Sequence, residues 1–348
     1  MILIITHSKD NDGHFSGAIC QYFEEKLNNI EADQISYLRW SYGDKDPDIE
    51  YLKCFDKIYI LDLTLSLNVM EFLAKEYKGS VIWIDHHLAN YSKLPEYILN
   101  LIPGIRNHEY AACVNTWEWW LNFISLNQNL YKELIDFNEQ VYDALGALEI
   151  DESLFYNLES NWAIMRKNTP IWLYLIGCYD IWKWHGSDLW NKYIIPFEYF
   201  LRSDIEGPKG AYEFIKDYFS CITYKVIPDI SSYITTGRYI FKYQEKRNNS
   251  VLGNLYKTTV INENTGKRVN CLVINTQDRG SVIFDNISPE LRSWSDYFIL
   301  WNCTGKKYKY SAYSEKPDVF VPDLKIKGCT FGGHPHAGGC VSDRKRLL

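Results

Sequence analysis

Histidine and aspartate side chains follow three short apolar runs of this 348-residue sequence. The residues are His7, Asp10 and Asp12 after Ile2–Thr6, Asp62 after Lys57–Leu61, and Asp85, His86 and His87 after Val81–Ile84. Short β-branched runs of this kind are typical of buried strands, and neighbouring parallel strands bring such ends to one edge of a sheet. Carboxylates gathered there repel one another unless cations bind between them. The pattern therefore predicts a site for divalent metal ions.

The donor types indicate which metals to expect. Carboxylates mixed with imidazoles, without a thiolate, favour Mn²⁺ or Mg²⁺ over a structural zinc site, with Fe²⁺, Co²⁺ and Zn²⁺ as less favoured ions. Two such ions about 3.5 to 4 Å apart stabilise both the attacking and the leaving oxygen of a phosphoryl displacement. The chemistry expected from this arrangement is phosphoester hydrolysis.

Each piece of the pattern also has a purely structural interpretation. Asp10-Asn11-Asp12-Gly13 is compatible with a turn whose aspartates bond the backbone. Asp62 could be a simple helix cap, a role open equally to Thr64 and Ser66. A lone histidine pair is usually a surface or core feature. The order of the three strand ends is what makes the metal interpretation more specific.

The first half of the chain alternates between strand and helix patterns. Ile35–Trp40 is a further expected strand, and Phe15–Leu27 and Leu67–Tyr77 have helical spacing. Helices are also expected at 110–126 and 129–148, and Trp172–Cys178 is a further apolar segment. Such βαβ alternation predicts an α/β fold with a mostly parallel sheet and helices on its faces.

The second half returns to alternating apolar residues. The expected strands are Tyr239–Tyr243, Asn254–Val260, Cys271–Ile274, Ser281–Asp285, Tyr297–Trp301 and Lys309–Tyr313. They indicate a smaller mixed α/β domain with an antiparallel-looking sheet. We expect a catalytic metal-binding domain at 1–185, a helical linker punctuated by proline and glycine at 186–237, and a substrate-binding domain at 238–348.

Composition bounds the class of protein. With 46% hydrophobic and 23% charged residues the chain has an ordinary globular composition. It holds no apolar run of the length that a membrane helix needs, and its polar residues follow Met1 too soon for a signal peptide. The nine cysteines form no C-x-x-C pair, which fits reduced thiols. We therefore expect a cytoplasmic protein without a membrane partner.

The net charge of −7 is unevenly distributed. Residues 1–237 hold 19 Lys and Arg against 34 Asp and Glu, whereas residues 238–348 hold 18 against 10. An excess of +8 in the second part is compatible with an anionic ligand, and also with a requirement for solubility alone.

A glycine cluster near the end of the chain suggests such a ligand. Gly332-Gly333 and Gly338-Gly339 flank two histidines, His334 and His336. Glycines let the backbone approach a ligand closely and expose N–H groups that can bind phosphate. A tight turn before a final strand would also explain the glycines, but not the two histidines.

Together these motifs resemble the DHH phosphoesterase family with its associated C-terminal domain. The resemblance rests on Ile84-Asp85-His86-His87, on His7 with Asp10-Asn11-Asp12-Gly13, and on Gly332–Gly339. It implies that His7 and Asp10 bind one metal, that Asp12 binds the other, and that Asp62 bridges both. It further implies that His86 binds metal, that Asp85 orients His86, and that His87 faces the scissile phosphate.

The resemblance also implies a fourth carboxylate and a set of substrate contacts. Asp180 is the match for the carboxylate, with Asp151 as the competing candidate. The expected substrate contacts are Gly332, Gly333, His334 and His336, with His108 on the substrate side of the metal domain. Where related enzymes carry an arginine before the glycine cluster, this chain has Tyr313, which we expect to stack on a base.

The expected function is hydrolysis of short nucleotides by a two-metal-activated water, with two Mn²⁺ ions, or Mg²⁺ or Co²⁺ in their place. Candidate substrates are nano-oligonucleotides, linear or cyclic dinucleotides and phosphoadenosine phosphate, and a homodimer is an open expectation. The alternatives are a single-strand 5′ exonuclease and a nucleotide-binding regulatory module. The chain ends nine residues after Gly339, which favours short substrates because exonuclease relatives usually carry an added oligonucleotide-binding domain there. The presence of every expected metal ligand favours an enzyme.

Overall fold

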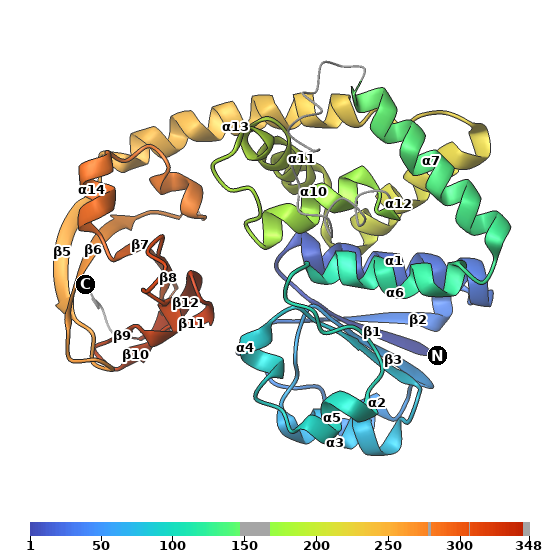
Figure 1. Cartoon of the computed structure of the whole chain (residues 1–348). Coiled ribbons are helices and arrows are strands. Elements are labelled where there is room, and N and C mark those ends of the chain that lie inside the picture. Colours follow the sequence, from blue (N-terminus) through green and yellow to red (C-terminus); the bar gives the residue numbers. More distant parts are fainter. Residues whose placement is uncertain (147–167, 278–279, 306, 344–348) are drawn as a thin grey trace. The chain divides into compact units, whose positions relative to one another are not determined.

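The computed structural model describes residues 1–146, 168–277, 280–305 and 307–343. Internal contacts divide the chain into two compact units, Met1–Phe241 and Lys242–Leu348. The division falls inside helix α13 (Ile230–Leu252) (Figure 1). Each unit has its own sheet, and the predicted α/β class is confirmed.

The first unit is built on a four-stranded sheet in which every neighbouring pair is parallel. Its strands, in spatial order, are β2 (Ile35–Trp40), β1 (Ile2–His7), β3 (Lys57–Leu61) and β4 (Val81–Ile84). The register pairs Thr6 with Leu61 and Leu61 with Ile84, so the carboxyl ends of β1, β3 and β4 lie level with one another. The residues that follow these strands therefore begin at the same edge.

Alternating side chains of these strands enter two separate cores. Ile4, Tyr59 and Ile84 face the core formed with α1 and α6, whereas Ile5 and Trp83 face the core that contains residues of α3 and α5. Successive side chains of a strand point to opposite faces, and a parallel sheet is normally covered on both. Figure 1 shows α1 and α6 on one face and α3 and α5 on the other.

The first unit includes helices from residues 186–237, the segment that the sequence predicts as a linker. Besides the part of α13 up to Phe241, the described helices of this unit are α1 (Asn11–Asn28), α2 (Ile49–Leu52), α3 (Leu67–Glu76), α4 (Leu88–Tyr91), α5 (Glu96–Leu101), α6 (Ala112–Ile124), α7 (Gln128–Gly146), α10 (Ile171–Asp180), α11 (Ile195–Asp204) and α12 (Gly207–Tyr224), with short 3-10 and π turns at Ala32–Gln34 and Trp190–Ile194. Helices α11 and α12, from the 186–237 segment, bury Phe197 and Ile215 in the same core as α1. Across the described ranges, no helix combines the length and the apolar composition that a membrane span requires.

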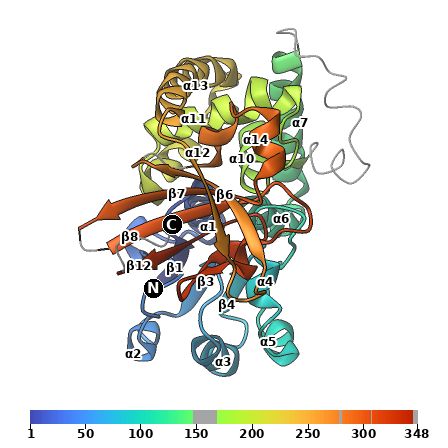
Figure 2. The same ribbon diagram turned by 90° about the vertical axis from the view of Figure 1, so that its left-hand side faces the viewer.

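The second unit contains a six-stranded sheet of mixed direction. Its strands, in spatial order, are β11 (Gly332–His334), β12 (Ala337–Ser342), β8 (Lys307–Tyr313), β7 (Tyr297–Thr304), β6 (Arg268–Asn275) and β5 (Tyr256–Ile261). Only β6 and β7 pair in parallel. Figure 2 shows β7, β8 and β12 side by side. Helix α14 (Pro289–Trp294) and 3-10 turns at Ser281–Phe284 and Val321–Asp323 pack on this sheet, and β9 (Lys325–Ile326) pairs with β10 (Cys329–Thr330).

Two strand predictions for the second half were wrong. Tyr239–Tyr243 belongs to α13, where Tyr239 and Tyr243 lie one turn apart and are 70% and 64% exposed. Aromatic and β-branched residues favour a strand locally, but a polar Gln244–Asn249 run continues the helix. Ser281–Asp285 begins with a 3-10 turn in which Val282 to Phe284 are all buried. A continuous apolar run has no periodicity that distinguishes a strand from such a turn.

Candidate metal centre

The ends of β1, β3 and β4 carry the predicted histidines and aspartates to one edge of the first sheet. Two groups of potential metal ligands form there, and within each group the ligand atoms all lie within 4.8 Å of one another. One group consists of His7, Asp10 and Asp62, and the other of Asp12, His86 and Asp180. A third combination joins Asp62 to His86 and His87. The fold thus assembles residues that are up to 173 positions apart, from His7 to Asp180.

The first group is formed where β1 passes into α1. His7 Nδ1 lies 2.5 Å from Asp10 Oδ2 and 3.7 Å from Asp62 Oδ2. Asp10 also caps α1, because its other oxygen accepts the N–H of Gly13 at 3.1 Å. A Cβ atom at Gly13 would lie 2.6 Å from the His7 carbonyl oxygen. Glycine at this position therefore allows the first turn of α1 to approach the end of β1.

The second group is centred on the His86 ring. His86 Nε2 lies 3.2 Å from Asp180 Oδ2, 3.2 Å from Asp62 Oδ1 and 3.5 Å from Asp12 Oδ2. One oxygen of Asp62 thus faces His7 and the other faces His86. Asp62 consequently lies between the two groups.

The backbone at Asp62 adopts an unusual conformation. Its φ is +63°, in the left-handed region, and its N–H donates to the carbonyl of Ile84 at 2.9 Å. Aspartate and asparagine tolerate this region better than other side chains with a Cβ. In this conformation the two carboxylate oxygens of Asp62 lie near His7 and His86.

The N-terminus of α6 positions Asp12. The Asp12 carboxylate accepts the backbone N–H groups of Ala112 at 2.9 Å and Cys113 at 2.6 Å. Unpaired N–H groups and the helix dipole at such an end stabilise an anion. Asp180, by contrast, is the last residue of α10, so it comes from the carboxyl end of its helix.

Asp85 directly precedes the histidine pair His86 and His87 in the sequence, and it is completely buried. Its Oδ1 accepts the backbone N–H groups of His86 at 2.8 Å and His87 at 3.0 Å, and lies 2.8 Å from His87 Nδ1. Its Oδ2 accepts the hydroxyl of Thr64 at 2.6 Å. These contacts fix both the loop after β4 and the ring of His87.

Burial and mutual repulsion determine the electrostatics of the two groups. Burial raises the pKa of Asp62 well above its ordinary value, and the neighbouring Asp12 and Asp10 raise it further. Burial likewise raises the pKa of Asp180, again with Asp12 and Asp10 contributing. Asp62 Oδ1 and Asp180 Oδ2 are buried oxygens without a hydrogen-bond partner. Buried acceptors of this kind are costly, and a cation between them would relieve both the repulsion and the missing contacts.

The pKa values of the two adjacent histidines, His86 and His87, are shifted in opposite directions. Burial lowers the pKa of His86, and the charge of His87 lowers it further, which favours the neutral imidazole that binds metals. Burial also acts to lower the pKa of His87, but the hydrogen bond and charge of Asp85 outweigh it, so the pKa is raised. The donor set of carboxylates and one imidazole per group fits hard divalent cations.

Two residues beside these groups were not anticipated as part of the site. The ring of Tyr42 lies 6.0 Å from that of His7 and 5.7 Å from that of His87, between centroids. Thr64, considered only as a helix cap, instead holds Asp85, while Ser66 is the N-cap residue of α3. Tyr42 follows the end of β2 and Thr64 follows the end of β3. Their position just after a strand is the signal in the sequence that could have identified them as part of the site.

Among the expected substrate residues, His108 belongs to the first unit and the others belong to the second unit. His108 is exposed in the turn before α6. Tyr313 ends β8, pairs with Ala337 and packs against the core on one face of the second sheet. Asp151, the alternative fourth carboxylate, lies outside the described residues, and so does the side chain of His334.

The glycine cluster forms the hairpin of β11 and β12. Gly332 pairs with Gly339, and Gly333 with Gly338. A Cβ atom added at Gly333 would lie 2.6 Å from the carbonyl oxygen of Ala337. One added at Gly338 would lie 2.1 Å from the carbonyl oxygen of Gly332, and one added at Gly339 would lie 2.6 Å from the carbonyl oxygen of Tyr310. A Cβ at Gly332 would meet nothing within 4 Å. Close backbone packing thus accounts for three of the four glycines.

His336, at the turn, has a buried Nδ1 without a hydrogen-bond partner, beside the ring of Phe320.

No protein-family model matches the sequence, and no curated protein matches it. The chain is similar to solved structures that include a pGpG-specific phosphodiesterase, PggH, from Vibrio cholerae, with 11% identity, a TM-score of 0.41, and coverage of 98% of this chain and 93% of that one. Another is an exopolyphosphatase-related protein from Bacteroides fragilis, with 15% identity, a TM-score of 0.38, and coverage of 97% and 85%. RecJ from Thermus thermophilus in complex with Mn²⁺ has 12% identity and a TM-score of 0.38, and this chain covers 49% of it.

Proposed function

We propose that this chain is a metal-dependent phosphoesterase of the DHH family that hydrolyses short nucleotides. The observation that carries the proposal is the position of Asp62 between two groups of ligands, with buried oxygens of Asp62 and Asp180 that have no hydrogen-bond partner. Crowding buried carboxylates costs free energy through desolvation and mutual repulsion, and bound cations would relieve both costs.

The ligands of the two proposed metal ions follow the two groups. His7 and Asp10 would hold one ion, Asp12, His86 and Asp180 would hold the other, and Asp62 lies between the two groups. Mn²⁺ is the first candidate, and Mg²⁺ and Co²⁺ suit the same donors. Bound divalent ions lower the pKa of water and neutralise charge that develops on a phosphate.

His87 is the proposed contact to the scissile phosphate. Its Nδ1 faces Asp85, so Nε2 is the nitrogen that can donate to a phosphate oxygen. The raised pKa of His87 favours the protonated ring, which is the better donor to an anion. Asp85 and Thr64 hold this ring in place, and a fixed donor stabilises developing charge more than a mobile one.

The second unit is proposed to bind the nucleotide. Its net charge is positive, and Gly332, Gly333, His334, His336 and Tyr313 are the proposed contacts to phosphate and base. These assignments rest on the resemblance of the glycine cluster to that of the family.

A substrate panel tests the proposal. Purified chain with Mn²⁺ is incubated with di- to decanucleotides of RNA and DNA, cyclic dinucleotides, phosphoadenosine phosphate and pyrophosphate, with Asp62→Asn as the inactive control. We expect rates that fall steeply as the oligonucleotide lengthens. Equal or faster digestion of long single strands would support the exonuclease alternative, and binding without hydrolysis would support a regulatory module. Sedimentation of the same preparation tests the expected homodimer.

A further inference from the structure

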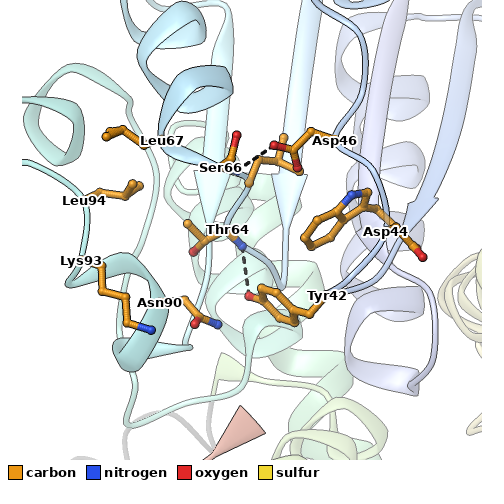
Figure 3. A pocket seen from close by; sticks show the side chains of 11 residues that line it. Tyr42, Asp44, Asp46, Thr64, Ser66, Leu67, Asn90, Lys93 and Leu94 are labelled. Carbon is orange, nitrogen blue, oxygen red and sulfur yellow. Dashed lines mark hydrogen bonds between the residues drawn. The ribbon is translucent and has the colours of Figure 1, made fainter. Parts of the chain in front are cut away.

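A pocket of about 510 Å³ opens in the first unit beside the metal centre. It lies where the segments after β2 and β3 meet α4 and the residues that follow it (Figure 3). Pockets that hold small molecules are of this size, and in α/β sheets they lie beyond the carboxyl ends of the strands. None of the metal ligands proposed above lines this pocket.

Tyr42 is the wall that the pocket shares with the metal centre. Its ring contacts His7 and His87, and it is 40% exposed. Its hydroxyl accepts the N–H of Thr64 at 3.2 Å, as Figure 3 shows, and the hydroxyl of Thr64 holds Asp85. A molecule in the pocket would therefore lie next to the histidine that is proposed to contact the phosphate.

The charges of the pocket select against a second phosphate. Asp44 and Asp46 line it together with one cation, Lys93, and the carboxylates of the metal centre lie beyond Tyr42. A phosphate placed here would meet a net negative charge without an ion to neutralise it. The negative charge instead suits an occupant that donates hydrogen bonds, either a neutral group or a cation.

The polar groups of the pocket fit a nucleobase with an amino group. Asp46 is held by one oxygen, which accepts the N–H of Ser66 at 3.3 Å, and its second oxygen can accept from a ligand. Asn90 and Lys93 can donate to the carbonyl or ring nitrogen of a base. The rings of Trp40 and Tyr42, packed edge to face at 5.3 Å, add an aromatic wall of the kind on which bases rest.

We propose that this pocket binds the nucleoside adjacent to the scissile phosphate, and that it prefers bases with an amino group. The inference rests on the proposed function and narrows its substrate class. Guanosine should bind more tightly than inosine, because the two differ only in the 2-amino group, from which Asp46 can accept a hydrogen bond. Tyr42 would separate the nucleoside from the metal ions.

Nucleoside binding to the full chain with Mn²⁺, measured by calorimetry, tests the pocket without requiring catalysis. Asp46→Asn should weaken guanosine binding about tenfold, since hydrogen bonds to a charged acceptor are among the stronger ones, and should reduce the preference over inosine. The matched control is Asp48→Asn, which lies in the same segment but caps α2 outside the pocket. Leu67→Trp should block binding by filling the pocket, with Leu101→Trp as its control, because the two leucines are 45% and 43% exposed and only Leu67 lines the pocket.

The outcomes separate this inference from the proposed function. Nucleoside binding that Leu67→Trp and Asp46→Asn weaken, in a chain that hydrolyses no nucleotide, would support the pocket and contradict the phosphoesterase. Hydrolysis of dinucleotides with the same KM in wild type, Leu67→Trp and Asp46→Asn would support the phosphoesterase and overturn the pocket. No nucleoside binding to the wild type at millimolar concentration would also overturn it. A raised KM for dinucleotides in both variants, with unchanged hydrolysis of a phosphodiester that lacks a nucleoside, would support both.

Discussion

The metal centre of the first unit and the glycine hairpin of the second were equally prominent motifs in the sequence, but their geometry differs. In the metal centre, packing leaves the crowding of Asp62 and Asp180 unexplained, because buried oxygens of both lack hydrogen-bond partners. In the hairpin, packing explains the glycines at 333, 338 and 339, because a side chain there would collide with neighbouring backbone. The comparison teaches that a motif points to a ligand when the fold alone cannot account for its residues.

Asp62→Asn should give the largest effect on the metal centre. We expect loss of at least one bound metal and a fall in hydrolysis of about 1000-fold or more, since a two-metal clamp supplies several kcal/mol. Asparagine tolerates the positive φ of this position, so the variant should stay folded. Metal content, circular dichroism and turnover measure the three effects. Normal metal content with normal turnover would remove Asp62 from the centre.

His86→Ala and His87→Ala should separate metal binding from phosphate contact. His86→Ala should lose metal, whereas His87→Ala should keep it and lose about 100- to 1000-fold in kcat, the usual effect of removing one donor to developing charge. Metal analysis beside steady-state kinetics distinguishes the two. Equal metal content and equal loss of activity in both variants would contradict these roles.

Gly338→Ala and Gly332→Ala test the packing explanation of the hairpin. A Cβ at Gly338 would lie 2.1 Å from the carbonyl oxygen of Gly332, so this variant should lower the free energy of unfolding by about 1–3 kcal/mol or more. Gly332→Ala meets no neighbouring atom and should change stability by less than about 0.5 kcal/mol. Chemical denaturation measures both. Loss of nucleotide hydrolysis in stable Gly332→Ala would indicate a substrate contact that packing does not explain.

A further prediction is a dependence of stability on pH that reverses when metal is added. Without metal, the raised pKa values of Asp62 and Asp180 mean that the folded chain keeps protons which the unfolded chain releases above about 3.8. Stability from these two groups therefore falls as the pH rises from that value toward their raised pKa. With Mn²⁺ the trend reverses, because the metal binds the ionised carboxylates. Thermal unfolding of wild type, compared with Asp62→Asn at several pH values, isolates the contribution of Asp62; parallel curves would contradict it.

Much of the first unit could be predicted from the sequence because its signals are local. The strands Ile35–Trp40, Lys57–Leu61 and Val81–Ile84 have the predicted bounds, and their parallel register brings the residues after β3 and β4 together. Contacts from distant segments carried no such signal. The N–H groups of Ala112 and Cys113 reach Asp12 across 100 and 101 residues. In the second unit, short glycine-rich strands such as β11 lack the alternation on which strand prediction depends.

The left-handed backbone at Asp62 also affects how this chain could change by mutation. The residues that accept such a conformation most readily are glycine, asparagine and aspartate. In the genetic code, aspartate codons become asparagine codons by a change of the first base and glycine codons by a change of the second. One nucleotide substitution could therefore remove the central carboxylate and leave the fold intact. A descendant that keeps the fold and lacks the carboxylate between the two ligand groups would lie a single step away.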